Sequence, residues 1–269
     1  MRTRLVLILG IIALVWVPIG AASGQDDGSA LLDWLAFIPA TPLNAENPVY
    51  FGDLDAWHTS WGVPRPRTLQ QLDFLNRDWH AAWLFTMPKQ LVLPEALGLQ
   101  YLFQDEQRPF YGFDIFGIDR FVYAGAPPDM VTVLEHHLDP AAIGKALVAS
   151  GYEAGDVNGG TLYSILDDYE ISFEGLPRVG SLGQLNRIAL VDNQMIIGRA
   201  TAPVTDTLAA AQGETPSLAA LPAWTAGAKA LDDSALDGTG ELVAAILWQT
   251  MIAADPLTVL APAEGQPTP

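Results

Sequence analysis

The 269-residue chain contains no cysteine. Without thiols it forms no disulfide and uses no thiol nucleophile, so packing alone must hold the fold together. Basic residues are also scarce. The chain has 13 Lys and Arg but 31 Asp and Glu, which gives a net charge of −18. Such a chain repels nucleic acid and anionic membrane surfaces, since binding to either depends on Lys and Arg. We therefore expect no nucleic-acid partner, and no membrane contact beyond the N-terminal segment described below.

The sequence also lacks the short motifs of common cofactor and catalytic sites. It has no G-x-G-x-x-G or G-x-x-x-x-G-K-[ST] loop for a nucleotide and no HExxH or Cys/His spacing for zinc. The nearest approach to a G-x-S-x-G serine elbow is Gly180-Ser181-Leu182-Gly183, in which the first glycine lies one place too close. The sequence therefore predicts no catalytic residue, no cofactor and no metal site.

Two groups of metal-ligating side chains have a plainer explanation. Asp156, Asn158 and Asp167 match positions 1, 3 and 12 of an EF-hand loop, but threonine replaces the glycine of position 6. A hairpin turn explains these residues better, and calcium binding by Asp156 and Asp167 stays open. His136 and His137 are neighbours on a predicted strand, so their side chains point to opposite faces and do not chelate one ion together. One should be exposed and the other packed near the edge of the sheet.

The longest hydrophobic run lies at the N-terminus. Arg2 and Arg4 precede an apolar stretch over 5–19, and small residues follow at 21–24. This pattern is typical of a cleaved secretory signal peptide and predicts a secreted or extracytoplasmic protein with residues 1–24 removed. Removal takes away two arginines and no acid, which changes the net charge from −18 to −20. The alternative is an uncleaved signal anchor that tethers the protein to the membrane.

Residues 25–112 are predicted to form a mainly helical region that is rich in tryptophan. Thr68, followed by Gln71 three residues later, indicates the start of one of its helices. Five of the eight tryptophans of the chain lie in this region, and four of them form two pairs with i, i+4 spacing. These five are Trp34, Trp57, Trp61, Trp79 and Trp83. Residues at that spacing share one face of a helix.

Residues 113–255 change in character and predict two strand–strand–helix units. Two strands are expected over 121–124 and 131–138, followed by a helix capped by Asp139-Pro140. Two more are expected over 187–191 and 195–198, followed by a helix from Thr201. Between the units, Asn158-Gly159 predicts a two-residue hairpin turn of type I′. The region over 241–248 reads equally well as a buried strand or a helix, and residues 256–269 are predicted to be disordered. The expected fold is α+β, an antiparallel sheet with helices on one face.

The second region resembles a family of exported bacterial proteins of unknown function with repeated strand–helix units. The resemblance rests on the hairpin, on the Asp-Pro helix that ends in Gly151-Tyr152, and on the segment SLAALPAWTAGAKAL at 217–231. It covers residues 113–250 and depends on spacing and on a pattern of small residues. The resemblance implies export and carries over no catalytic residue.

These observations favour a non-enzymatic extracytoplasmic module that binds a ligand or a protein at the cell surface. A ligand is expected against Trp57, Trp61, Trp79 and Trp83, with Tyr50, Phe74 and Phe85 as neighbours, because aromatic rings supply large apolar contacts. Burial of all four tryptophans in the core is the competing interpretation. The alternatives are a purely structural surface protein and a secreted hydrolase with a dispersed active site. The hydrolase predicts a serine or an acid pair beside His58 or His80 in a deep pocket.

Overall fold

The computed structural model describes residues 30–97, 107–172, 183–236 and 242–248. The predicted signal peptide (1–24), the predicted disordered tail (256–269) and Gly180-Ser181-Leu182 therefore lie outside the described residues. Among the helices that are described, none has the length and apolar character needed to cross a membrane.

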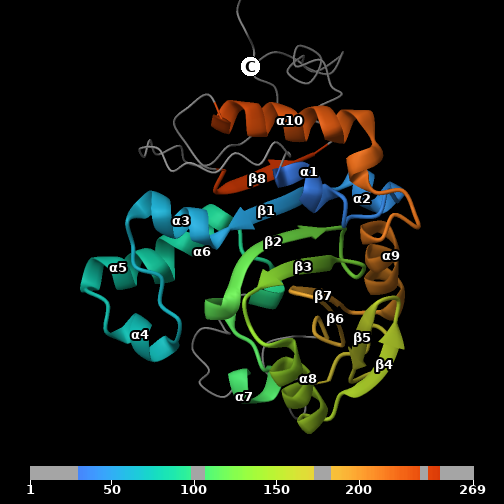
Figure 1. Ribbon diagram of the computed structural model, residues 1–269, viewed down its shortest axis with the longest axis horizontal. Helices are drawn as coiled ribbons and strands as arrows, with labels where there is room; N and C mark the ends of the chain where they lie inside the picture. Colours follow the sequence, from blue (N-terminus) through green and yellow to red (C-terminus); the bar gives the residue numbers. More distant parts are fainter. Residues whose placement is uncertain (1–29, 98–106, 173–182, 237–241, 249–269) are drawn as a thin grey trace, which may run out of the picture.

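A single antiparallel sheet runs through the described part of the chain, with strand order β4-β5-β6-β7-β3-β2-β1-β8 (Figure 1). The strands are β1 Val49–Asp53, β2 Ile118–Ala124, β3 Val131–His136, β4 Glu153–Val157, β5 Gly160–Ser164, β6 Arg187–Val191, β7 Gln194–Gly198 and β8 Ala244–Leu247. The hairpins β2–β3 and β6–β7 are the strands of the two predicted units, and they meet where β3 pairs with β7. Helices together with this sheet confirm the predicted α+β class.

The helices before β2 are short, and those after β3 are longer. They are α1 Ala30–Leu35, α2 Pro42–Glu46, α3 Leu54–Trp61, α4 Leu69–Asp73, α5 Arg77–Ala81, the π-helical turn η1 Ala82–Thr86, α6 Met87–Leu91, the 3-10 turn η2 Glu95–Leu97, α7 Gln107–Tyr111, the 3-10 turn η4 Ile115–Gly117, α8 Pro140–Ala149, α9 Thr201–Ala211, the 3-10 turn η6 Leu218–Ala220 and α10 Pro222–Leu236. Apart from β1, the described part of 25–112 is built from helices and loops, as the sequence predicts.

Helices cover both faces of the sheet. Buried side chains of α3, α6 and α8 join the core on one face, whereas those of α1, α9 and α10 join the core on the other. Phe121 packs into the first core and its neighbour Val122 into the second, and both are fully buried. Strands that are apolar on both sides need cover on both sides. The expectation that helices lie on one face is therefore wrong, and the helices of the two units, α8 and α9, lie on opposite faces.

The local signals in the second region are mostly confirmed. Asn158-Gly159 forms the two-residue turn between β4 and β5, where Val157 pairs with Gly160. Of the two turn residues only Gly159 has a positive φ (76°), so the turn is not of type I′, which requires positive φ at both positions. Asp139 caps α8 by accepting a hydrogen bond from the Ala141 amide at 3.0 Å. The ambiguous segment 241–248 contains a strand, β8.

Candidate functional site

The chain leaves the sheet after β1 and forms a layer of short helices over residues 54–91, called the helical segment below (Figure 1). Asp53, the last residue of β1, caps α3 because its Oδ1 accepts a hydrogen bond from the Ala56 amide at 2.8 Å. α3 ends at Gly62, whose φ of 59° suits a residue without a side chain. The helical segment holds four of the chain's eight tryptophans and two of its four histidines.

The structure separates the four predicted ligand-binding tryptophans into two buried and two exposed side chains. Trp57 and Trp83 are 0% and 1% exposed, and the Trp57 indole donates a hydrogen bond to Gln90 Oε1 at 2.7 Å. Trp61 and Trp79 are 41% and 37% exposed. Trp61 stacks on Trp57 with ring centroids 6.0 Å apart. In each i, i+4 pair, one tryptophan is therefore buried in the core and the other faces solvent. The ligand role of the four residues stays a prediction.

Two of the residues predicted to lie beside the ligand, Phe74 and Phe85, add to the exposed aromatic surface. Phe74 is 80% exposed and Phe85 is 63% exposed. Phe85 lies in the π-helical turn η1, two residues from the buried Trp83, and such turns occur often at functional sites. Tyr50 instead stacks on Tyr123 in the sheet, with ring centroids 4.5 Å apart. The exposed aromatic side chains of the helical segment, called the aromatic face, are Trp61, Phe74, Trp79 and Phe85.

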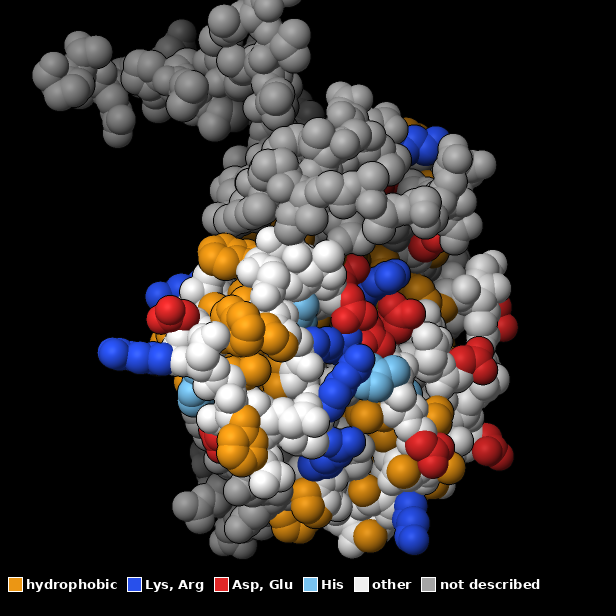
Figure 2. All heavy atoms as spheres, turned by 60° about the vertical axis from the view of Figure 1, so that its left-hand side comes forward, with side chains coloured by type: hydrophobic (Ala, Val, Ile, Leu, Met, Phe, Trp, Pro, Cys, Tyr) orange, Lys and Arg blue, Asp and Glu red, His pale blue; other side chains and the backbone are white. Residues whose placement is uncertain are grey.

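The helical segment also differs from the rest of the chain in charge. It carries four of the 13 basic residues and only three of the 31 acidic ones. Arg67, Arg77 and Lys89 are exposed, and none of them pairs with a carboxylate in the part of the chain that the structure describes. Figure 2, which brings the left-hand side of Figure 1 forward, shows hydrophobic side chains beside a band of Lys, Arg and His.

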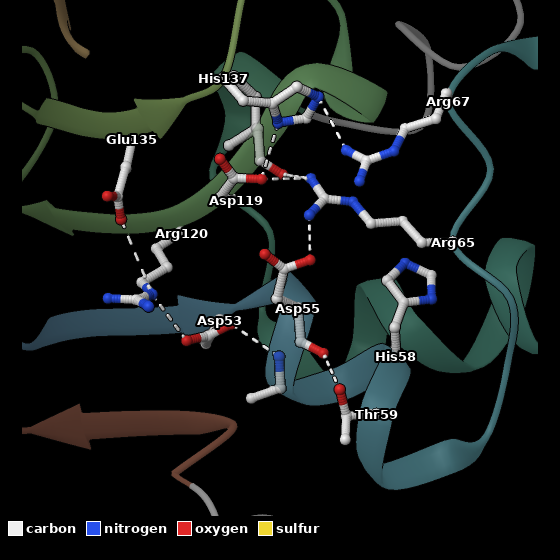
Figure 3. A network of polar contacts seen from close by, with 12 residues as sticks. Asp53, Asp55, His58, Thr59, Arg65, Arg67, Asp119, Arg120, Glu135 and His137 are labelled. Carbon is white, nitrogen blue, oxygen red and sulfur yellow. Dashed lines mark hydrogen bonds and ion pairs between the residues drawn. The ribbon is translucent and has the colours of Figure 1, made fainter. Parts of the chain in front are cut away.

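A network of ion pairs joins the helical segment to the sheet (Figure 3). The register of β2 against β3 shifts between Ile118 and Arg120, so Asp119 occupies a bulge. Bulges re-aim side chains, and the Asp119 carboxylate meets Arg65 Nη2 at 2.7 Å. The Arg65 guanidinium also pairs with Asp55 and donates a hydrogen bond to the Ile118 carbonyl at 2.7 Å. These bonds hold the loop after α3 against β2.

His137 extends the same network toward solvent. Its Nδ1 lies 2.8 Å from Asp119 Oδ1, and its Nε2 lies 2.9 Å from Arg67 Nη1. Because a guanidinium only donates hydrogen bonds, Nε2 is the acceptor and the ring proton sits on Nδ1. An Asp–His pair activates a nucleophile when Nε2 faces a hydroxyl or thiol, but here it faces a guanidinium with no attacking lone pair. The arrangement therefore positions Arg67 and does not form a hydrolytic triad.

His137 is exposed, as predicted for one of the two histidines, but His136 lies on β3, an inner strand between β7 and β2, and not near the sheet edge. His136 is 2% exposed in β3, whereas the His137 side chain is 38% exposed. The link from His137 to Arg67 spans 70 residues, and no sequence spacing indicates it. Asp156 lies on β4 and Asp167 lies beyond β5. Within the described ranges, no group of three or more His, Cys, Asp or Glu side chains is placed to hold a metal ion.

His58 is the most perturbed ionisable group of the helical segment. It is 6% exposed, and its Nδ1 donates a hydrogen bond to the Val63 carbonyl at 3.1 Å. Its Nε2 has no partner among the described residues, and its ring lies 5.5 Å from the Trp83 ring. Burial lowers the pKa of His58 to about 4, although the Val63 carbonyl opposes this shift. His58 is therefore neutral at physiological pH and belongs to the core.

Comparison of the chain with protein-family models, with curated proteins and with solved structures finds no match.

Proposed function

We propose that this protein is a non-enzymatic extracytoplasmic binding module that docks a protein partner through the aromatic face of its helical segment. The observation that carries the proposal is the exposure of four large aromatic side chains on one segment, from 37% for Trp79 to 80% for Phe74. The same segment carries three exposed cations that have no carboxylate partner among the described residues. Exposed large apolar side chains that are concentrated on one segment commonly mark an interaction site.

The degree of exposure favours a protein over a small ligand. Small ligands bind in concave sites that bury most of the ligand's surface. Phe74 and Phe85, in contrast, are more than half exposed to solvent. Protein interfaces are enriched in Trp, Phe and Arg, and such residues dominate binding energy once they are covered. Phe74 is 80% exposed, so a partner that covers it removes most of its surface from water. Full burial of a phenylalanine side chain is worth about 1.5–3 kcal/mol before the costs of association are subtracted.

The positive charges of the helical segment indicate which side chains the partner should carry. Arg67, Arg77 and Lys89 complement acidic side chains, and Arg67 is held in place by His137 and Asp119. The protein as a whole carries a net charge of −18. Long-range repulsion is screened beyond about 8 Å at physiological ionic strength, so the local cations act on a partner at contact distance. The expected partner therefore presents apolar side chains flanked by Asp or Glu.

The N-terminal sequence supports an extracytoplasmic location. Residues 1–24 have the charge, apolar core and small residues of a secretory signal peptide, and their removal leaves the aromatic face on an exported protein. N-terminal sequencing of the protein from the culture medium tests this point. A retained Met1 would instead indicate a tethered protein.

A library of random dodecapeptides, displayed on phage and selected against residues 25–269, tests the docking proposal without knowledge of the natural partner. Selected peptides should be enriched in aromatic or aliphatic residues together with Asp and Glu. Their affinity should fall at least tenfold for the double variant Phe74→Ser/Phe85→Ser. Val148→Ser is the matched control, because Val148 is a 53% exposed apolar residue on α8.

Peptides that bind the double variant as tightly as the natural sequence would overturn the docking site. Selected peptides without acidic residues would overturn the proposed partner chemistry. Circular dichroism of each variant confirms that it is folded, and the exposure of both phenylalanines makes loss of the fold unexpected.

A further inference from the structure

A pocket of about 280 Å³ lies far from the helical segment, between α2, the loop before β3, the loop after β5, and α9. Figure 1 shows α2 and α9 at the opposite end of the molecule from α4 and α5. The walls of this pocket combine carboxylates, hydroxyl groups and apolar side chains. The residues that matter for its chemistry are Asp129, Asp206, Tyr169, Thr207, Val131 and Pro203.

The polar groups of this pocket are acceptors and hydroxyls. Asp129 and Asp206 supply two carboxylates from separate elements, and no Lys, Arg or His is among the described residues that line the pocket. Thr207 lines the pocket, is 0% exposed, and its Oγ1 has no partner within the described ranges. A threonine in a helix usually bonds to the carbonyl one turn earlier, as Thr205 does with Thr201 on the same helix at 3.1 Å. The Thr207 hydroxyl is thus a buried polar group without its usual bond.

Tyr169 forms one wall of the pocket in a strained conformation. Its φ of 65° is uncommon for a residue with a side chain, and such outliers cluster at functional sites. The phenol donates a hydrogen bond to Asp129 Oδ1 at 2.5 Å, and this bond raises the pKa of Tyr169 to about 12. Because the proton is committed to Asp129, the phenol oxygen presents its lone pairs to a further donor.

The loop that carries Tyr169 is fixed to the body of the protein. Asp168 Oδ1 accepts a hydrogen bond from the Thr201 amide at 2.9 Å and lies 2.6 Å from Arg187 Nη2. The Arg187 side chain is 8% exposed and also donates a hydrogen bond to the Leu166 carbonyl at 2.6 Å. These bonds hold Tyr169 over the pocket before any ligand arrives, which reduces the entropy lost on binding.

We propose that this pocket binds a small organic cation, a primary ammonium group attached to an apolar body. The ammonium group has three donors and no acceptor, which matches the carboxylates of Asp129 and Asp206 and the oxygen of Tyr169. Val131 and Pro203 supply apolar walls for the carbon atoms. A bare metal ion would leave these apolar walls unused, since hard cations require a shell of oxygen ligands. This site is independent of the aromatic face.

The test compares three probes of similar shape and different charge, 2-phenylethylammonium, 2-phenylethanol and 3-phenylpropanoate. Each is titrated into residues 25–269 and followed by isothermal titration calorimetry. The ammonium probe should bind, the alcohol should bind at least tenfold more weakly, and the carboxylate should not bind. Asp206→Asn should weaken the ammonium probe about tenfold, because Asp206 is exposed on α9 and its replacement spares the core. Asp156→Asn, an exposed carboxylate on β4, is the matched control and should leave the affinity unchanged.

Equal binding of the alcohol and the ammonium probe would overturn the proposal, as would full affinity in Asp206→Asn. Absence of heat with every probe up to millimolar concentrations would also overturn it. Tyr169→Phe separates the local chemistry from a general charge effect, because it leaves both carboxylates in place and removes the phenol oxygen together with its bond to Asp129. The proposal requires a loss of affinity of at least threefold in that variant, with a circular dichroism spectrum that shows the fold is kept.

Discussion

The buried histidine of the helical segment makes the stability of this protein depend on pH in a predictable way. Burial lowers the pKa of His58 from 6.5 to about 4, so the folded state binds fewer protons than the unfolded state between these values. The stabilisation from neutral His58 is complete above pH 6.5 and is lost as the pH falls toward 4. At about 1.4 kcal/mol per pKa unit, the loss between pH 7.5 and pH 4 amounts to about 3 kcal/mol. Protonation places an N–H at Nε2, which has no partner within the described residues.

The measurement is urea unfolding followed by tryptophan fluorescence at several pH values between 7.5 and 4. His58→Gln retains a donor for the Val63 carbonyl but cannot gain a proton. Its free energy of unfolding should therefore fall with pH by about 3 kcal/mol less than that of the natural protein. His80→Gln, the same change on α5, reports the general effect of replacing a histidine in the helical segment. If His58→Gln and the natural protein lose the same free energy over this range, the assignment of a buried, neutral His58 is wrong.

Two further predictions concern packing and use urea unfolding at pH 7.5. Trp83→Ala should cost about 3–5 kcal/mol because the side chain is 1% exposed, whereas Trp61→Ala should cost about 1 kcal/mol because Trp61 is 41% exposed. Equal losses would contradict the division of the tryptophans into buried and exposed members. Gly52→Ala should cost about 1–3 kcal/mol, because a Cβ there meets the buried Phe121 ring at 2.3 Å. Gly155→Ala on β4, where the nearest atom to a Cβ is 4.0 Å away, should be nearly neutral, and a similar loss at both glycines would refute the steric argument.

Features that are encoded within a few residues were predictable from the sequence. The turn at Asn158-Gly159 and the cap at Asp139 depend on local backbone chemistry, and both occur where the sequence places them. The type of the turn was not predictable from the dipeptide alone. A I′ turn needs positive φ at Asn158 as well as at Gly159, and this conformation depends on how the sheet holds the hairpin.

Features that depend on contacts between distant parts of the chain were not predictable. The i, i+4 spacing places Trp57 and Trp61 on one side of α3, but only the packed structure shows that one is buried and the other is half exposed. His137 contacts Arg67 and is itself held by Asp119, which lies in a bulge of β2. No periodicity in the sequence marks that bulge. The same holds for the helices α8 and α9, which have similar sequence patterns and cover opposite faces.

Binding of a protein partner to the aromatic face can be followed through the indole N–H groups of the tryptophans. Residues 25–269 contain seven tryptophans in different parts of the molecule, and each gives a separate ¹⁵N–¹H signal. On titration with a peptide selected by display, the signals of Trp61 and Trp79 should shift, while those of Trp34 and Trp224 on the far face of the sheet should stay in place. Shifts at Trp34 or Trp224 without shifts at Trp61 and Trp79 would show that the partner binds elsewhere on the protein.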